Sequence, residues 1–244
     1  MKGVILAGGT GSRLIPHTKV TNKHLLPVGK KPMILHSIDK LIEANITNIM
    51  IVTGTEHMGD MISLLGSGKE HGCTCTYKVQ DDPSGIAGAL LLCEDFVGND
   101  DVAVILGDNI FSTSLNTVIN RFKLLKKDDN KTPICTLALK SVEDPQRFGV
   151  AEIVGDRIVG IEEKPTQPKS SYCVTGIYIY DKNVFSYIKN LSKSERNEYE
   201  ISDVNNQYMK KGTVTYIHLD GWWTDAGTHS SYHRANILAY KENL

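Results

Sequence analysis

The sequence predicts an α/β protein with a Rossmann-like, mixed but mainly parallel central sheet, covered by helices and continued by a β-rich extension. Three observations predict this fold class. Short apolar runs rich in β-branched residues recur along the first half of the chain, stretches with helical periodicity separate them, and strand-like segments with short connections dominate the second half. Strands that alternate with helices are typical of a parallel sheet, whereas strands in direct succession indicate antiparallel pairing.

The first half of the chain contains four apolar strand-like runs. These predicted strands are Lys2–Ala7, Asn48–Thr53, Thr74–Val79 and Val102–Leu106. Between the first two, Ile34, Ile38 and Leu41 recur at helical spacing, so an amphipathic crossover helix is expected over residues 33–44. Further helices are expected at Gly85–Phe96 and Leu115–Lys127.

The second half changes to strands with short connections. Here the predicted strands are Ile134–Lys140, Val150–Val154, Ile158–Glu163 and Val174–Tyr180, followed by a helix at Ile201–Lys211, a strand at Thr213–His218 and a helix at Ser230–Tyr240. The chain has no internal repeat, low-complexity tract or long linker. We therefore expect residues 1–244 to form a single domain.

Composition excludes several classes of protein. With 41% hydrophobic and 23% charged residues among 244, the chain is neither disordered nor membrane-spanning, since no run approaches the roughly 20 apolar residues of a bilayer crossing. The apolar run Val4–Ala7 is too short for a signal peptide. The five cysteines form no C-x-x-C pair, which favours reduced thiols. A soluble cytoplasmic protein without a membrane partner is expected.

Charge is distributed unevenly although the net charge is only -1. Residues 1–38 contain six Lys and Arg side chains and no Asp or Glu. A short basic segment on an acidic body indicates a local anion site, whereas nucleic-acid binding would require a wider basic face. The alternative is a solvated charge run, which is less favoured because the charges alternate with Gly and Pro.

A glycine-rich loop, Gly8–Arg13, follows the first predicted strand. Glycine lets backbone N–H groups approach an anion closely. Two phosphate motifs fail here, because a dinucleotide fingerprint requires glycine at Leu14 and a Walker loop requires it at Arg13. The alternative is a tight strand-to-helix turn. Arg13 and the nearby Lys23 favour the anion site.

Two acidic residues each follow a strand-like run. Asp108 comes after residues 102–107, and Asp225 comes after residues 222–224. Ligands bind at the carboxyl ends of strands in open α/β sheets, and Mg²⁺ takes a few carboxylate ligands together with substrate phosphates. The alternative for each is an Asp that caps a turn. Because both acids accompany a cationic loop, the sequence favours a magnesium site on Asp108 and Asp225.

The same residues resemble a known family. Residues 8–14, together with Pro16, Thr18, Lys23 and residues 25–28 and 31–34, resemble the signature of sugar-1-phosphate nucleotidyltransferases, most closely the glucose-1-phosphate thymidylyltransferases. Seven further segments match in family order: Gln80 with residues 85–87, then 107–109, 147–150, 162–165, 174–178, 200–205 and 223–228. The resemblance covers essentially the whole chain.

The resemblance implies a magnesium-dependent reaction between dTTP and glucose 1-phosphate. An oxygen of the sugar phosphate attacks the α-phosphorus, pyrophosphate leaves and dTDP-glucose forms, with no nucleic-acid partner. UTP or another hexose 1-phosphate is an alternative substrate, and a non-catalytic sugar-nucleotide sensor is an alternative function. A dinucleotide-dependent oxidoreductase would also suit the α/β pattern. However, this chain lacks the third glycine of the dinucleotide fingerprint. A homo-oligomer is implied as well.

The resemblance also implies roles for individual residues. The catalytic set is Arg13, Lys23, Asp108 and Asp225. The nucleotide is expected to contact Gly8, Gly9, Thr10, Gly11, Ser12, Arg13, Lys23, Gln80, Gly85 and Asp108, with Gln80 facing a pyrimidine base, Arg13 on the β- and γ-phosphates and Lys23 on the α-phosphate. The sugar phosphate is expected to contact Asn109, Gly149, Glu163, Lys164, Val174 and Thr175. Residues 1–130 thus form a nucleotide-binding half, and residues 131–244 form a sugar-phosphate-binding half.

The roles of some residues stay open, and one position departs from the family pattern. Glu200 and Asp203 either border the cleft or are acids of a helix start, and Arg196 is left outside the site. Gly88 stands where the family commonly carries glutamine, which predicts looser contacts with the nucleotide or the helix start. Only 15 residues follow His229, whereas longer family members continue with a helical segment tied to subunit packing and an effector site. Weak or absent feedback control is expected.

Overall fold

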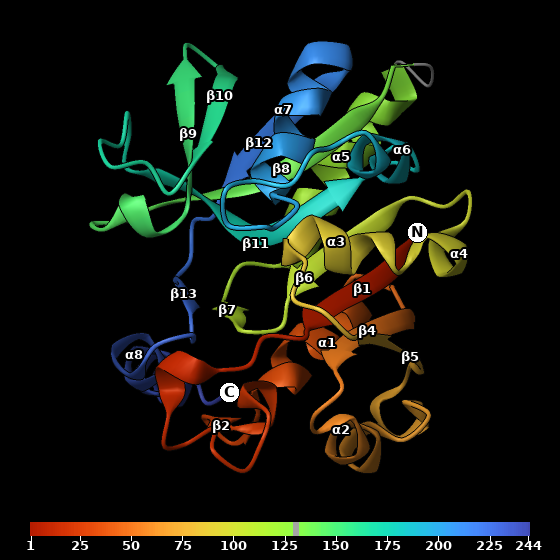
Figure 1. Ribbon diagram of the computed structural model, residues 1–244, viewed down its shortest axis with the longest axis vertical. Coiled ribbons are helices and arrows are strands. Elements are labelled where there is room, and N and C mark those ends of the chain that lie inside the picture. Colours follow the sequence, from red (N-terminus) through yellow and green to blue (C-terminus); the bar gives the residue numbers. More distant parts are fainter. Residues whose placement is uncertain (129–131) are drawn as a thin grey trace.

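The computed structural model describes residues 1–128 and 132–244 (Figure 1). In chain order its strands and helices are β1 (Lys2–Ala7), β2 (Pro27–Val28), β3 (Lys31–Pro32), α1 (Met33–Glu43), β4 (Asn48–Gly54), α2 (Met58–Leu65), β5 (Thr74–Gln80), α3 (Gly85–Leu91), α4 (Glu94–Val97), β6 (Val102–Leu106), β7 (Asn109–Phe111), α5 (Leu115–Asp128), β8 (Ile134–Ser141), β9 (Gly149–Val154), β10 (Arg157–Glu163), β11 (Tyr172–Tyr180), α6 (Val184–Lys189), α7 (Ile201–Lys211), β12 (Thr213–His218), β13 (Trp223–Asp225) and α8 (His229–Lys241).

A mixed sheet organises the molecule. Within the described residues it has nine strands: seven in the order β10-β9-β11-β6-β1-β4-β5, then β8, which pairs with β11, and β12, which pairs with β8. Strands β6, β1, β4 and β5 are parallel to one another, whereas β11 runs antiparallel to β6 and β8. The β9–β10 hairpin projects away from the rest of the sheet (Figure 1). This arrangement confirms the predicted fold class.

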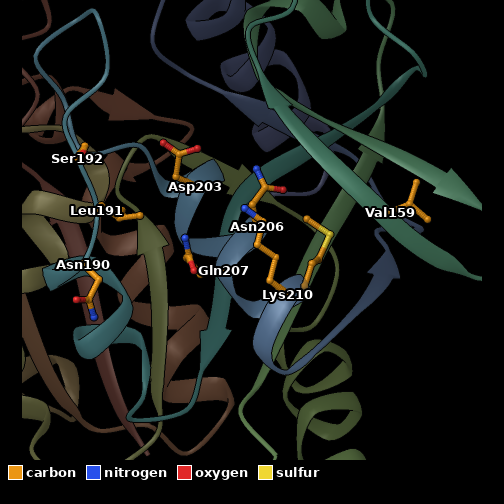
Figure 2. Close-up of a pocket in the computed structure, with 9 residues that line it drawn as sticks. Val159, Asn190, Leu191, Ser192, Asp203, Asn206, Gln207 and Lys210 are labelled. Carbon is orange, nitrogen blue, oxygen red and sulfur yellow. The ribbon is translucent and has the colours of Figure 1, made fainter.

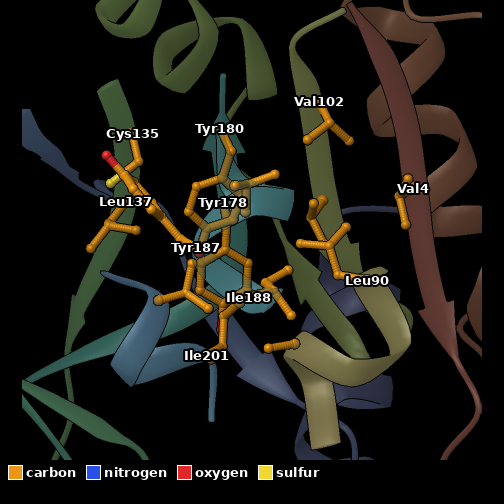
Figure 3. Close-up of a cluster of buried hydrophobic side chains, with 14 of the residues drawn as sticks. Val4, Leu90, Val102, Cys135, Leu137, Tyr178, Tyr180, Tyr187, Ile188 and Ile201 are labelled. Atoms are coloured by element: carbon orange, nitrogen blue, oxygen red, sulfur yellow. The ribbon is translucent and has the colours of Figure 1, made fainter. Parts of the chain in front are cut away.

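The sheet carries one apolar cluster on each face, because successive strand residues point to opposite sides. Val4 and Leu6 of β1 belong to the cluster covered by α3, α6 and α7. Ile5 and Ala7 belong to the cluster covered by α1, α2 and α5. Figure 3 shows the first cluster, in which the fully buried Tyr180 lies centrally. Helices on both faces leave the carboxyl ends of the parallel strands open for a ligand.

A third, smaller cluster lies beneath α8. It packs Ala235 and Ala239 of this helix against Ile110 of β7. Strand β13 pairs with β7 so that Asp225 lies opposite Asn109. This short two-stranded sheet brings the last part of the chain to the end of β6.

The structure differs from the predicted elements in a few places. The helix predicted at Gly85–Phe96 is two helices, α3 and α4; the pattern did not show the break because Leu90, Cys93 and Val97 are buried at helical spacing across it. Helix α6 was not predicted, since its sequence VFSYIK is rich in residues that favour strands. Burial of four of its six residues stabilises it as a helix.

Three further observations bear on the expectations from the sequence. The boundary expected between residues 130 and 131 lies outside the described residues. Across residues 1–128 and 132–244, no helix has the length and apolar character needed to cross a bilayer. All five cysteines carry free thiols, as the absence of C-x-x-C spacing indicated.

Candidate active site

A cleft of about 450 Å³ opens over the carboxyl ends of β1, β5 and β6. Most of the residues expected to bind substrates line it. They are Gly8, Gly9, Arg13, Lys23, Gln80, Gly85, Asp108, Asn109, Gly149, Glu163, Lys164, Val174 and Asp225. The first half of the chain supplies one wall, and β9, β10, β11 and the start of α7 supply the other. One continuous cleft therefore joins both sets of predicted residues.

The glycine loop brings two functional side chains close to its backbone. A Cβ on Gly8 would lie 2.8 Å from Oε1 of Gln80, and a Cβ on Gly9 would lie 3.2 Å from Nζ of Lys23. Gly11 has a φ of 66°, and a Cβ there would lie 2.8 Å from the Thr18 side chain. Larger residues in this loop would push the amide and the ammonium away from the cleft.

Lys23 and Asp108 form an ion pair at the centre of the cleft. The Nζ of Lys23 lies 2.5 Å from Oδ2 of Asp108, and the two side chains are 11% and 14% exposed. Burial pushes the pKa of the Asp108 carboxyl upward, but the charge and hydrogen bond of Lys23, together with His24 and the hydrogen bond from Asn109, outweigh burial and hold this pKa well below its usual range. Asp108 is therefore ionised at neutral pH.

Asp225 reaches the same place through the short β7–β13 sheet. The backbone N–H of Ala226 donates to the carbonyl oxygen of Asp108 at 2.7 Å, which fixes the two acidic residues side by side. Burial, and next the charge of Asp108, raise the pKa of Asp225 to about 6. Arg147 partly opposes this shift, with Nη2 lying 3.2 Å from Oδ2 of Asp225.

Gly227 borders the carboxylates of Asp108 and Asp225 and the guanidinium group of Arg13. A Cβ on Gly227 would lie 3.5 Å from Oδ2 of Asp108 and 3.5 Å from Oδ2 of Asp225. Glycine thus leaves a small volume that both carboxylate oxygens border. Burial is the first cause of the raised pKa of Asp225 and repulsion by Asp108 is the second; a cation bound by both carboxylates would relieve this repulsion. In the described part of the chain, no group of three or more His, Cys, Asp or Glu side chains could hold a metal.

Asn109 lies beneath this pair of acids, and both the oxygen and the nitrogen of its amide bond to protein groups. Its Nδ2 donates to Oδ1 of Asp108 at 2.9 Å. Its Oδ1 accepts from the Gly176 N–H at 2.9 Å and from Nε1 of Trp223 at 2.7 Å. Asn109 borders the cleft, but these bonds make it a support for Asp108 and β11 whose amide is already occupied by protein groups.

The opposite wall presents a carboxylate beside a lysine. Ser202, at the start of α7, donates to Oε2 of Glu163 at 2.6 Å, and Nζ of Lys164 lies 3.7 Å from Oε1 of Glu163. Lys164 has a φ of 46°, an unusual backbone conformation for a residue with a side chain. A Cβ on Gly149 would lie 2.7 Å from Oγ of Ser202, so glycine permits this arrangement.

The expectation for Thr175 requires a correction. Thr175 is fully buried, and its hydroxyl donates to the carbonyl oxygen of Ala138 at 2.8 Å, on the side of β11 away from the cleft. Val174, Gly176 and Tyr178 line the cleft instead. Adjacent strand residues point to opposite faces, so Val174 and Thr175 cannot both face the same pocket.

Three residues of the glycine loop also lie apart from the cleft wall. Thr10 and Ser12 are exposed, and Gly11 is half-buried. None of the three lines the cleft as the structure describes it, although their neighbours Gly9 and Arg13 do. Any contact of these three residues with a phosphate would therefore come through the loop backbone at the rim.

Several cleft residues had not been assigned roles from the sequence. Arg147, His24, Ser202 and Trp223 all line the cleft. Arg147 lies in the matched segment 147–150, which was the available signal. His24 follows Lys23 directly, and burial lowers its pKa to about 3, so the imidazole is neutral. Nothing in its local sequence distinguished it from an ordinary histidine.

The two acids at the start of α7 do not line the cleft. Glu200 precedes the helix and binds Arg196, whose Nη2 lies 2.7 Å from Oε2 of Glu200. Asp203 lines a second cavity of about 540 Å³ on the outer side of α7, together with Asn206 and Lys210 (Figure 2). The helix-start interpretation of both acids is therefore the better one.

Comparison with known proteins agrees with this geometry. The sequence model of the nucleotidyl transferase family matches residues 2–242, so the chain belongs to the nucleotidyltransferase family. Within that class, the chain is 43% identical over 238 residues to the glucose-1-phosphate thymidylyltransferase of Neisseria meningitidis, covering 96% of this chain and 81% of that protein.

Solved structures place the fold in the same class. A Bacillus anthracis protein assigned to the glucose-1-phosphate thymidylyltransferases, crystallised with sucrose, has a TM-score of 0.92 and 61% identity over 98% of this chain and 95% of its own. A UDP-glucose pyrophosphorylase complexed with UDP-glucose has a TM-score of 0.82 and 26% identity over 99% of this chain and 98% of its own.

Proposed function

We propose that this nucleotidyltransferase transfers thymidylate from dTTP to glucose 1-phosphate, giving dTDP-glucose and pyrophosphate. The observation that carries the proposal is one cleft that pairs a cationic glycine loop and two carboxylates with a carboxylate–lysine wall. The 43% identity to a glucose-1-phosphate thymidylyltransferase supports these substrates. UTP is the runner-up, since a UDP-glucose pyrophosphorylase shares the fold.

The chemistry requires two polyanions to be aligned and requires no protein nucleophile. An oxygen of the sugar phosphate attacks the α-phosphorus, the bond to the bridging oxygen of the β-phosphate breaks, and pyrophosphate leaves with that electron pair. Orientation of two bound reactants can supply about 7–11 kcal/mol of the barrier. Arg13 and Lys23 would hold the phosphates of the triphosphate, and Lys164 would hold the phosphate of the sugar, because all three side chains line the cleft.

The two halves of the chain divide this work. Residues 1–130 would hold the nucleotide, with the Gln80 amide facing the base, because an amide both donates and accepts. Residues 131–244 would hold the sugar phosphate, with Glu163 accepting from hexose hydroxyls. Ser202 donates a hydrogen bond to the Glu163 carboxylate, and the missing side chain of Gly149 leaves room for both groups.

We further propose that Asp108 and Asp225 hold Mg²⁺. When bound, the ion would neutralise negative charge on the phosphate oxygens. In the absence of the ion, Lys23 and Arg147 neutralise the two carboxylates. The same two cations line the cleft, where they could also bind phosphate oxygens.

The direct test is pyrophosphate release with a panel of triphosphates and sugar 1-phosphates, with and without Mg²⁺. We expect turnover with dTTP and glucose 1-phosphate that a chelator stops. Preference for UTP or for another hexose would replace the substrates but keep the reaction. Tight nucleotide binding without turnover on any pair would support the sugar-nucleotide sensor instead.

A further inference from the structure

Ser84 stands at the N-terminal boundary of α3 but does not cap this helix. Serine at this position usually accepts a hydrogen bond from the first helical turn, yet the Ser84 side chain accepts none there. The backbone of Tyr199 bonds to the start of the helix instead. Its carbonyl oxygen accepts from the Ala87 N–H at 3.3 Å, and its own N–H donates to the carbonyl oxygen of Ser84 at 2.9 Å. The Ser84 hydroxyl is therefore available for another partner.

That partner is the side chain of Gln80. The Nε2 of Gln80 donates to Oγ of Ser84 at 3.3 Å. On its other side, Oε1 of Gln80 lies against the glycine loop, 2.8 Å from where a Cβ on Gly8 would stand. The amide is thus held between the loop and the start of α3, at the wall of the cleft.

Gly88 provides the room for this arrangement. A Cβ on Gly88 would overlap Oγ of Ser84 and would lie 2.8 Å from Cβ of Ser84 and 3.4 Å from the Tyr199 ring. Glycine inside a helix costs roughly 1 kcal/mol relative to alanine, so its presence calls for a compensating benefit. The space beside Gly88 is filled by Ser84 and Tyr199.

We propose that Ser84 is a positioning residue for nucleobase selection, and that Gly88 is its steric counterpart. The proposal rests on the proposed function, in which Gln80 faces a pyrimidine. Thymine offers an N3–H donor between two carbonyl acceptors, whereas cytosine offers an N3 acceptor beside an amino donor. An amide with Nε2 held by Ser84 keeps one orientation of its donor and acceptor edges. Without that hydrogen bond, both orientations become accessible.

The test measures kcat and KM for both substrates, and kcat/KM for dTTP against dCTP. Loss of one hydrogen bond predicts that Ser84→Ala raises KM for dTTP about two- to tenfold. The preference for dTTP over dCTP should fall by a similar factor. In contrast, kcat and KM for glucose 1-phosphate should stay unchanged. The matched control is Ser186→Ala, which removes a hydroxyl from the first turn of the distant helix α6.

Gly88→Ala provides an independent route to the same defect, because the new methyl group would displace the Ser84 hydroxyl. It should reproduce the change in base preference, and the double variant should be no worse than either single variant, since both act through one hydrogen bond.

Calorimetric binding of dTTP gives a readout that does not depend on turnover. Wild-type protein that turns over no substrate pair would overturn the proposed function. The other outcome concerns Ser84 alone. If the wild-type protein turns over its substrates and Ser84→Ala has the same KM, dTTP affinity and base preference as wild type, the role of Ser84 is overturned while the proposed function stands.

Discussion

The Nζ of Lys23 lies 2.5 Å from Oδ2 of Asp108, although 85 positions separate the two residues in the chain. The contact joins the cationic segment after β1 to the end of β6, and both side chains are largely shielded from water. A buried carboxylate with a single ammonium partner depends strongly on that partner. Several expected outcomes follow from this pair and its neighbours.

Lys23→Ala should abolish turnover. Loss of the ammonium removes both the expected contact to the α-phosphate and the charge that keeps Asp108 ionised, so we expect a decrease in kcat of about 10²- to 10³-fold. Pyrophosphate release measures the rate, and circular dichroism checks the fold. The control is Lys19→Ala, because Lys19 is an exposed lysine of the same segment. Equal rates in wild type and Lys23→Ala would remove Lys23 from the mechanism.

His24 should make the protein sensitive to acid. Burial, followed by the charge of Lys23, lowers the pKa of His24 to about 3 from 6.5. A base with a lowered pKa in the folded state contributes stability that is complete above pH 6.5 and is lost as the pH falls toward 3. From pH 7 to pH 4, wild type should lose on the order of 3 kcal/mol more unfolding free energy than His24→Asn. Urea unfolding at both pH values measures the difference, and parallel curves would contradict it.

Asp225 should have the opposite pH dependence. Its pKa of about 6, raised first by burial, exceeds the ordinary 3.8. An acid with a raised pKa in the folded state contributes stability that is complete below pH 3.8 and is lost as the pH rises through about 6.

Asp225→Asn should therefore stabilise the chelator-treated protein at pH 8 by about 2–3 kcal/mol, while abolishing turnover. The gain should vanish near pH 4. Asp156→Asn, at an exposed turn, is the control and should change neither quantity. If Asp225→Asn is less stable than wild type at pH 8, the prediction is wrong. The ion pair of Asp225 with Arg147 would then stabilise the fold by more than burial of the charged carboxylate destabilises it.

Gly149→Ala should impair the sugar side of the cleft selectively. The new methyl group would lie 2.7 Å from Oγ of Ser202 and 3.3 Å from Oε2 of Glu163, so the carboxylate must move. We expect KM for glucose 1-phosphate to rise about tenfold, the effect of about 1.4 kcal/mol, with KM for dTTP unchanged. Gly59→Ala is the control, because a Cβ there meets no atom within 4 Å. A rise in both KM values would indicate a general disturbance of the fold.

Most strands could be predicted from the sequence because their signals are local. The runs Lys2–Ala7, Val102–Leu106 and Thr213–His218 are strands with the predicted bounds. Helix α7 is likewise observed at the predicted Ile201–Lys211. Residues 222–224 were described as strand-like, but three residues are too few for a periodic pattern that would place β13 in a sheet. Its existence depends on pairing with β7, far away in the chain.

In the candidate site, too, some features could be predicted from local sequence and others could not. Lys23 and Asp108 were predicted because a glycine loop and an acid after a strand are recognisable motifs, and their meeting is a consequence of neighbouring parallel strands. Which side of β11 faces the cleft could not be inferred from the sequence of the strand itself. Both Val174 and Thr175 were expected there, and the position of the strand in the sheet selected Val174.

The sequence by itself determined the fold class, the family and the residue types that the chemistry requires, because these depend on local periodicity and on motifs with a recognisable order and spacing. Only the tertiary structure decided that Arg147 pairs with Asp225, that the amide of Asn109 is occupied by protein groups, and that Ser84 holds Gln80 in the room left by Gly88. Such contacts join side chains from separate elements over a few ångströms. Their distances depend on how strands and helices pack, which no short stretch of sequence encodes.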